Sequence, residues 1–286
     1  IDTGPAGGAA VIHPARAIAM ARVNVGSVAL DCELRGQGPP LLMINGFRRS
    51  RVVWLEPLLA ALEPHFRMIL FDNRGTGHSD QPQVGYSIET FADDCAGLLE
   101  ALGIRRAHVF GTSMGGMIAQ RVATRHAGLV HGLALGCTNC GKGSIAADKR
   151  IWGLLRLLPD AKLDAREVAR RQEEAYVTDD FRAGNRVLLD RLFEIVNENP
   201  TPVQVVKAHQ AAIEAFDACG ELGRIAAPTL VITGAEDRLI PAENSRLLAK
   251  RIPGAKLNLL ADCAHFFWIE KPRETAQALI DFFTPL

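Results

Sequence analysis

Three residues whose types suit nucleophilic catalysis each follow a strand-like segment. The first, Ser113, lies in Gly111-Thr112-Ser113-Met114-Gly115, after an apolar run and before a stretch with helical spacing. Gly-x-Ser-x-Gly between a strand and a helix predicts a nucleophile elbow, a sharp turn that exposes the serine hydroxyl on a strained backbone. The two glycines remove Cβ atoms that would collide where the strand and the helix approach closely.

A serine hydroxyl is a weak nucleophile, so it needs a base to take its proton and a carboxylate to orient that base. Asp237 follows an apolar run at 228–233, and His265 follows another at 256–260. The carboxyl ends of parallel strands meet at one edge of a sheet, and the chain order serine, acid, histidine suits such a site. We therefore predict a catalytic triad of Ser113, Asp237 and His265.

Other titratable residues offer alternatives to these assignments. Glu236 and Asp262 adjoin the predicted acid and base in the sequence, and we expect both to be solvated loop charges. His78, in the loop after a buried strand at 68–71, could line the pocket. The other histidines are expected to have structural roles far from this edge, namely His13, His65, His108, His126, His131 and His209.

Acyl transfer also needs N–H donors for the developing oxyanion. One expected donor is the backbone amide of Met114, the first residue of the elbow helix, where the helix dipole favours an anion. The other is the amide of Phe47 in the loop after the third strand, because Gly46 allows the backbone to turn there. Both side chains are expected to face the pocket, although simple packing is the alternative.

Four further side chains are candidates for the substrate pocket. Arg48, beside the oxyanion loop, could pair with a substrate carboxylate, although a surface arginine is the simpler interpretation. Trp152 could line the pocket, but large residues at helical spacing more often form a core. Asn45 and Phe266 adjoin the oxyanion loop and the predicted base.

The composition excludes several functional classes. Of the 286 residues, 48% are apolar, which suffices for a large core, and no segment approaches the length of a membrane span. Lys plus Arg and Asp plus Glu both number 32, so nucleic acid is not the expected partner. A small, uncharged or weakly charged ligand suits this balance, no membrane partner is expected, and a homo-oligomer is possible.

The cysteines and the N-terminus indicate a cytoplasmic protein. The six cysteines lie in apolar surroundings, and Cys137-Thr138-Asn139-Cys140 has no second pair to complete a zinc or redox motif. We expect reduced, buried thiols. The N-terminus lacks the basic region and the long apolar stretch of a signal peptide, and residues 1–21 are expected to be an extension outside the fold.

The order of elements predicts an α/β fold. Strands alternating with helices imply a mostly parallel eight-stranded sheet with right-handed crossovers. Residues 141–226 contain almost no strand-like run and show helical stretches broken at Pro159, Gly184 and Pro200. We expect this segment to be a helical cap inserted after the sixth strand, over a core formed by residues 22–140 and 227–286.

These motifs together resemble the α/β-hydrolase superfamily over residues 22–286. The segment 72–80 is similar to its D-x-R-G-x-G-x-S loop, 234–241 to its acid loop, and 263–272 to its histidine loop. Residues 41–139 are most similar to 3-oxoadipate enol-lactonases, with cofactor-free haloperoxidases and aromatic C–C bond hydrolases slightly less similar. Asn45 stands where many members have histidine, which slightly favours the lactonase branch. Haloalkane dehalogenases and epoxide hydrolases use an aspartate nucleophile, so Ser113 argues against both.

The expected activity is hydrolysis of a small carboxylic ester or lactone through an acyl-enzyme. No metal or organic cofactor is required, because the nucleophile and the base are both side chains. A C–C bond hydrolase, a thioesterase or a cofactor-free haloperoxidase (perhydrolase) would use the same triad. A non-catalytic small-molecule receptor on this fold is the alternative from another class.

Overall fold

A single eight-stranded sheet organises the molecule, whose computed structural model describes residues 18–157 and 162–286. The strand order is β1-β2-β4-β3-β5-β6-β7-β8, and only the β1–β2 and β2–β4 pairs are antiparallel. The expected α/β fold is confirmed. The strands are Ile18–Val25 (β1), Val28–Arg35 (β2), Pro40–Ile44 (β3), Arg67–Phe71 (β4), Ala107–Thr112 (β5), Val130–Gly136 (β6), Thr229–Gly234 (β7) and Lys256–Leu260 (β8).

The first strand corrects the expected N-terminal boundary. The sequence places residues 18–21 in an extension, but β1 pairs with β2 along its whole length, from Ile18 opposite Arg35 to Val25 opposite Val28. The sequence of residues 18–21 is apolar throughout and lacks the alternation that would mark a half-buried strand, and Met20 of this edge strand is 56% exposed. The remainder of the proposed extension, residues 1–17, lies outside the described residues.

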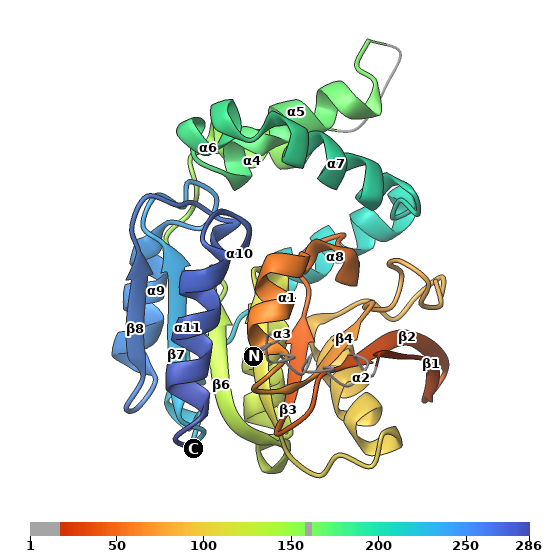
Figure 1. Ribbon diagram of the computed structural model, residues 1–286, viewed down its shortest axis with the longest axis vertical. Coiled ribbons are helices and arrows are strands. Elements are labelled where there is room, and N and C mark those ends of the chain that lie inside the picture. The colour runs from red at the N-terminus through yellow and green to blue at the C-terminus, as the bar shows by residue number, and fades with distance from the viewer. Residues whose placement is uncertain (1–17, 158–161) are drawn as a thin grey trace, which may run out of the picture.

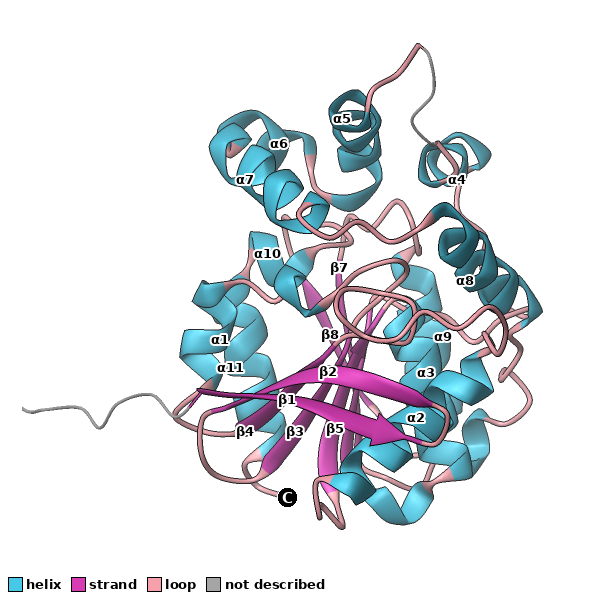
Figure 2. Cartoon of the chain, turned by 90° about the vertical axis from the view of Figure 1, so that its right-hand side faces the viewer, coloured by secondary structure: helices cyan, strands magenta, loops and turns pink. Residues whose placement is uncertain are grey.

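Helices cover both faces of the sheet (Figure 2). Helices α1 (Glu56–Leu62) and α11 (Pro272–Phe283) pack on one face, and α2 (Ile88–Ala101), α3 (Met114–Arg125) and α9 (Ala242–Arg251) on the other. Alternate residues of β3 enter separate apolar clusters on the two faces, as expected for a strand buried on both sides. The short helices are Arg51–Val53 (η1), Ala127–Leu129 (η2), Leu222–Arg224 (η3) and Phe267–Glu270 (α10).

Between β6 and β7, five α-helices of the described residues form a cap at one end of the sheet (Figure 1). Side-chain oxygens of Asp148, Asp164 and Thr178 accept hydrogen bonds from first-turn amides of the helices that follow them, which explains where α4, α5 and α6 begin. The expected break at Pro159 lies outside the described residues. The cap helices are Lys149–Leu155 (α4), Ala165–Tyr176 (α5), Asp179–Gly184 (α6), Arg186–Asn197 (α7) and Val203–Ala215 (α8).

A disulfide joins the two ends of the cap. Cys140, just after β6, is bonded to Cys219, just after α8, and 79 positions separate them in the sequence. The expectation that all six thiols are reduced is therefore wrong for this pair. Nothing in the spacing signals the bond, because the partners meet only when the cap folds back on the core. Cys32, Cys95, Cys137 and Cys263 are free and buried.

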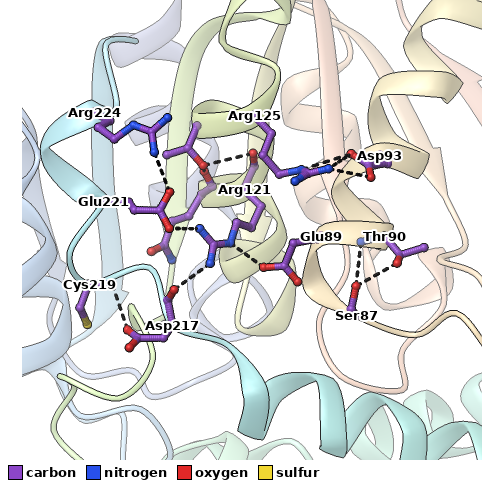
Figure 3. Close-up of polar contacts among 12 residues, drawn as sticks. Ser87, Glu89, Thr90, Asp93, Arg121, Arg125, Asp217, Cys219, Glu221 and Arg224 are labelled. Atoms are coloured by element: carbon purple, nitrogen blue, oxygen red, sulfur yellow. Dashed lines mark hydrogen bonds and ion pairs between the residues drawn. The ribbon is translucent and has the colours of Figure 1, made fainter.

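Polar contacts also fix the exit of the cap to the elbow helix (Figure 3). Arg121 of α3 donates to the carbonyl oxygen of Asp217 at 2.7 Å and pairs with Glu221 at 2.5 Å and with Glu89 of α2 at 2.8 Å. Its guanidinium also lies over an aromatic face, 5.4 Å from the ring centroid of Phe216. The base of the cap and the helix that carries Met114 are thus one connected unit.

Within residues 18–157 and 162–286, no helix is both long enough and apolar enough to span a bilayer.

Candidate active site

Ser113 occupies a strained turn between β5 and α3. Its backbone has φ 57° and ψ −121°, which is unusual for a residue with a side chain. A Cβ at Gly111 would lie 2.1 Å from the carbonyl oxygen of Gly115, and a Cβ at Gly115 would lie 2.2 Å from that of Ile44. The two glycines therefore permit the close strand–helix contact that holds the serine in this conformation.

Asp237 and His265 form a buried hydrogen-bonded pair. Oδ2 of Asp237 lies 2.8 Å from Nδ1 of His265, and Oδ1 accepts from the amides of Leu239 and Ile240 at 2.9 and 2.8 Å. The aspartate is 5% exposed and the histidine 1%. The three hydrogen bonds orient the carboxylate, and its contact with the ring places the imidazole proton on Nδ1. The Nε2 atom is then left as a base.

The end of β6 connects this pair to the elbow. The Ser113 amide donates to the carbonyl oxygen of Gly136 at 2.9 Å, and the Thr138 hydroxyl donates to the carbonyl oxygen of Ser113 at 2.7 Å. Cys137 lies between Gly136 and Thr138, and its Sγ atom is 3.9 Å from Nε2 of His265. The contacts therefore place the imidazole beside the elbow, although none of the hydrogen bonds among the described residues joins the Ser113 hydroxyl to the ring.

Cys137 was not expected at this site. Its thiol, the Asp237 carboxylate and the His265 ring offer donor atoms within 4.8 Å of one another. Burial raises the pKa of the thiol well above its usual range, and the charge of Asp237 adds to this effect. The Asp237 carboxylate and the His265 ring already bind each other. The donor set therefore suits a hydrogen-bonded pair beside a neutral thiol better than a metal centre.

A cavity of about 470 Å³, here called the serine cavity, opens at Ser113. Phe47 and Met114 line it beside the serine. The Phe47 amide has no acceptor among the hydrogen bonds of the described residues, and Met114 begins α3, where an amide has no acceptor within the helix. Both N–H groups are available to an oxyanion. The opposite wall comes from the cap and the acid loop, through Trp152, Leu155, Ile213, Phe216, Leu239 and Ile240.

The four candidate pocket residues separate into three environments. Trp152 lines the serine cavity, whereas Arg48 and Phe266 line a second cavity of about 450 Å³ that shares no lining residue with it. Asn45 is fully buried and lines neither. Its side-chain amide donates to the carbonyl oxygen of Phe71 at 3.0 Å, so it holds the oxyanion loop against β4 instead.

His209 corrects the expectation that it lies far from the site. It sits on α8, and its Nδ1 atom lies 3.5 Å from the amide of Arg48 in the oxyanion loop, while Nε2 lies 3.3 Å from the carbonyl oxygen of Arg74. Burial lowers the pKa of this ring to about 4, so the histidine is neutral. No local pattern in the sequence indicates this contact, because it depends on how α8 folds back over the core.

The alternative acids and His78 lie outside the site. Glu236 and Asp262 are both exposed, as expected of solvated loop charges. His78 is also exposed and lines neither cavity. Its amide donates to the buried carboxylate of Asp72, which also accepts from the Arg51 amide at 2.7 Å. The 72–80 loop therefore has a structural role below the cap.

Comparisons with known proteins agree with this architecture. A model of the α/β hydrolase fold matches residues 39–272. The chain is 31% identical over 256 residues to a Stutzerimonas stutzeri protein named "Putative carbamate hydrolase RutD", covering 87% of this chain and 94% of that protein. It is 28% identical over 260 residues to 2-hydroxy-6-oxo-6-phenylhexa-2,4-dienoate hydrolase of Comamonas testosteroni, covering 86% and 88%.

A solved structure shows the same likeness. The enol-lactonase from Burkholderia xenovorans LB400 superimposes with a TM-score of 0.80 at 28% identity, covering 93% of this chain and all of that one. The resemblance thus extends through the sheet and the cap. By the family model, the relatives and the fold alike, this chain belongs to the α/β hydrolase family.

Proposed function

We propose that the protein is a serine hydrolase that cleaves a carboxylic ester or lactone of a small molecule through an acyl-enzyme on Ser113. The observation that carries this proposal is the strained serine, which opens into a cavity beside a buried histidine–aspartate pair. Backbone strain of this kind persists where the surrounding structure enforces it, and a nucleophile elbow is such a place.

In this mechanism Nε2 of His265 takes the proton of Ser113 as the hydroxyl oxygen attacks the carbonyl carbon. The amides of Phe47 and Met114 stabilise the oxyanion, which collapses to the acyl-enzyme as the protonated His265 gives its proton to the leaving oxygen. A water molecule, deprotonated by the same nitrogen, then releases the acid. Asp237 keeps the imidazole in the required tautomer and remains ionised.

The walls of the serine cavity support a small, largely apolar substrate. Aromatic and aliphatic side chains of the cap face the serine, and the volume of about 470 Å³ is within the range of small-molecule sites. Arg156, at this cavity, is already paired with Glu214 at 2.8 Å. The likeness to an enol-lactonase favours an ester or lactone bond.

A second candidate is cleavage of a C–C or carbamate bond by the same residues. The names of the Comamonas and Stutzerimonas relatives motivate it. Matched panels of aryl esters, lactones, thioesters, carbamates and vinylogous 1,5-diketones would separate these reactions, and hydrogen peroxide in acetate buffer would reveal perhydrolysis. Binding without turnover of any of them would indicate a receptor.

The direct test of the nucleophile uses a fluorophosphonate probe and p-nitrophenyl butyrate. We expect the protein to be labelled at Ser113, and Ser113→Ala to lose labelling and to lower kcat by at least about 10⁴-fold, as in other triads. Ser27→Ala, an exposed serine in the β1–β2 turn, is the matched control and should behave as the unmodified protein. Retained esterase activity in Ser113→Ala would refute the assignment.

A further inference from the structure

The second cavity under the cap, here called the arginine cavity, lies between α5, α7 and the loop after β3. Its volume is about 450 Å³. Its walls are mostly apolar, and two arginines adjacent in the sequence, Arg48 and Arg49, line it at the loop. The apolar walls come mainly from Val168, Leu189, Leu192, Phe193, Val196 and Val206.

Arg48 is held firmly at the boundary of this cavity. It has a left-handed backbone with φ 52°, its amide faces His209, and its carbonyl oxygen accepts from the Thr201 hydroxyl at 3.1 Å. Its guanidinium donates to the side-chain oxygen of Gln172, a neutral partner that is 1% exposed. Among the described residues, Arg48 forms no ion pair.

None of the five N–H donors of the Arg48 guanidinium therefore has an anionic partner among the described residues. Burial lowers the pKa of this group, and the charge of Arg49 adds to the effect while Tyr176 opposes it. An arginine nevertheless stays protonated at neutral pH. A half-buried charge without a counter-ion carries a free-energy cost that an anion would offset.

Arg49 presents a second cation to the same space. Its guanidinium lies 5.2 Å from the ring centroid of Tyr176 and 5.7 Å from that of Phe266. Aromatic faces stabilise the cation but do not use its N–H donors. Within the described part of the chain, Arg49 too has no ion pair.

Glu173 is the one acidic side chain among the described residues that line the cavity, and it is already neutralised. Both of its carboxylate oxygens accept from Arg186, at 2.7 and 2.6 Å. Two cations, no available carboxylate and an apolar wall define what the cavity can bind.

We propose that the arginine cavity binds an organic carboxylate, with the carboxylate at Arg48 and Arg49 and an aliphatic or aromatic body against α5 and α7. A bidentate contact with a guanidinium suits the planar carboxylate. The cavity is large enough for a ligand of a dozen or more heavy atoms. Binding here does not depend on turnover at Ser113.

The test is titration calorimetry of 4-phenylbutanoate and its neutral analogue 4-phenylbutanamide, with Ser113→Ala as the host so that catalysis plays no part. We expect the acid to bind at least about tenfold more tightly than the amide. Arg49→Gln and Arg48→Gln should each weaken the acid about tenfold or more and leave the amide unchanged. Gln172→Glu should weaken the acid as well, because it supplies Arg48 with an internal anion.

Arg171→Gln is the matched control, since Arg171 lies on α5, is exposed and is paired with Glu167 at 2.9 Å. It should leave the acid affinity unchanged. Trp152→Ala, which alters only the serine cavity, should also leave it unchanged. Equal affinity for acid and amide, unchanged affinity in Arg49→Gln and Gln172→Glu, or a loss in Trp152→Ala would overturn the proposal. Thermal melts identify any variant that fails to fold, and Arg49→Gln and Gln172→Glu keep the test decisive if Arg48→Gln does not fold.

Discussion

The serine cavity and the arginine cavity lie under one cap and have nearly equal volumes, about 470 and 450 Å³, but their cations are in different states. Arg156 of the serine cavity is paired with Glu214, and Lys142 and Lys149 are exposed to water. In the arginine cavity, Arg48 has one neutral partner and Arg49 has aromatic ones. The first cavity therefore suits a neutral reactant, and the second an anion.

Helix α8 is the wall between them. Val206, one turn before His209, faces the arginine cavity, whereas Ile213, one turn after it, faces the serine cavity. Figure 2 shows α7 on one side of the cap and α4 and α8 on the other. Changes that act on one cavity alone can therefore be distinguished from changes that disturb the cap as a whole.

The largest effect is expected from Asp237→Asn. The amide would hold His265 in the wrong tautomer, so kcat for an activated ester should fall about 10⁴-fold. The affinity of the arginine cavity for 4-phenylbutanoate should not change. Steady-state kinetics and calorimetry on one preparation measure both, with Asp262→Asn, an exposed neighbour with φ 53°, as the control. An unaffected kcat would show that Asp237 does not orient the base.

The chemistry of the serine cavity was the part most accessible to sequence analysis. Gly111 and Gly115 are fixed by backbone collisions that any residue with a Cβ would cause, so the elbow leaves a local signal. The acid and the histidine follow strands, and parallel strands deliver their loops to one edge. Local patterns of this kind survive without knowledge of tertiary contacts.

The division of the cap into two cavities was not accessible in this way. Arg48 follows the oxyanion loop directly in the sequence, yet its guanidinium faces Gln172, 124 positions away, and not the serine cavity. The contacts of Cys137 with His265 and of Cys140 with Cys219 likewise join segments that only the folded chain brings together. Such pairings depend on helix packing, which no short motif encodes.

The disulfide should affect both cavities together. Replacing Cys140 and Cys219 by serine frees the two ends of a long loop, and we expect the free energy of unfolding to fall by about 4 kcal/mol. Urea unfolding of the double variant and of the original protein, each with and without dithiothreitol, measures this. Reductant should lower the stability of the original protein to that of the variant and leave the variant unchanged; a response in both would point to another cause.

Acid should lower the stability of the protein through His209 on α8, the helix between the two cavities. The pKa of His209 is lowered to about 4 in the folded protein, against 6.5 for the free side chain, so the unfolded chain binds more protons between these pH values. The resulting stabilisation, about 3 kcal/mol, is present above pH 6.5 and is lost as the pH falls toward 4. Relative to the original protein, His209→Gln should therefore lose less stability between pH 7 and pH 4.

Unfolding curves at several pH values test this difference. His108, whose pKa is likewise lowered to about 4 by burial, is present in both proteins and cancels from the comparison. His65→Gln, an exposed histidine, is the control and should follow the original protein. Parallel pH dependence in His209→Gln and the original protein would mean that His209 contributes nothing to the acid sensitivity.

The smallest effect is expected from a change that leaves an arginine of the serine cavity without its ion pair, as in the arginine cavity. Glu214→Gln removes the partner of Arg156, but both side chains are about half exposed, so water screens the freed charge. Inhibition of ester hydrolysis by the carboxylate product should strengthen by no more than about fivefold. Product-inhibition constants measure the change, and Gln210→Glu on the same helix, which adds a charge, should act in the opposite direction. A much larger gain in Glu214→Gln would show that exposure does not protect this cavity from anions, and that pairing alone separates the two.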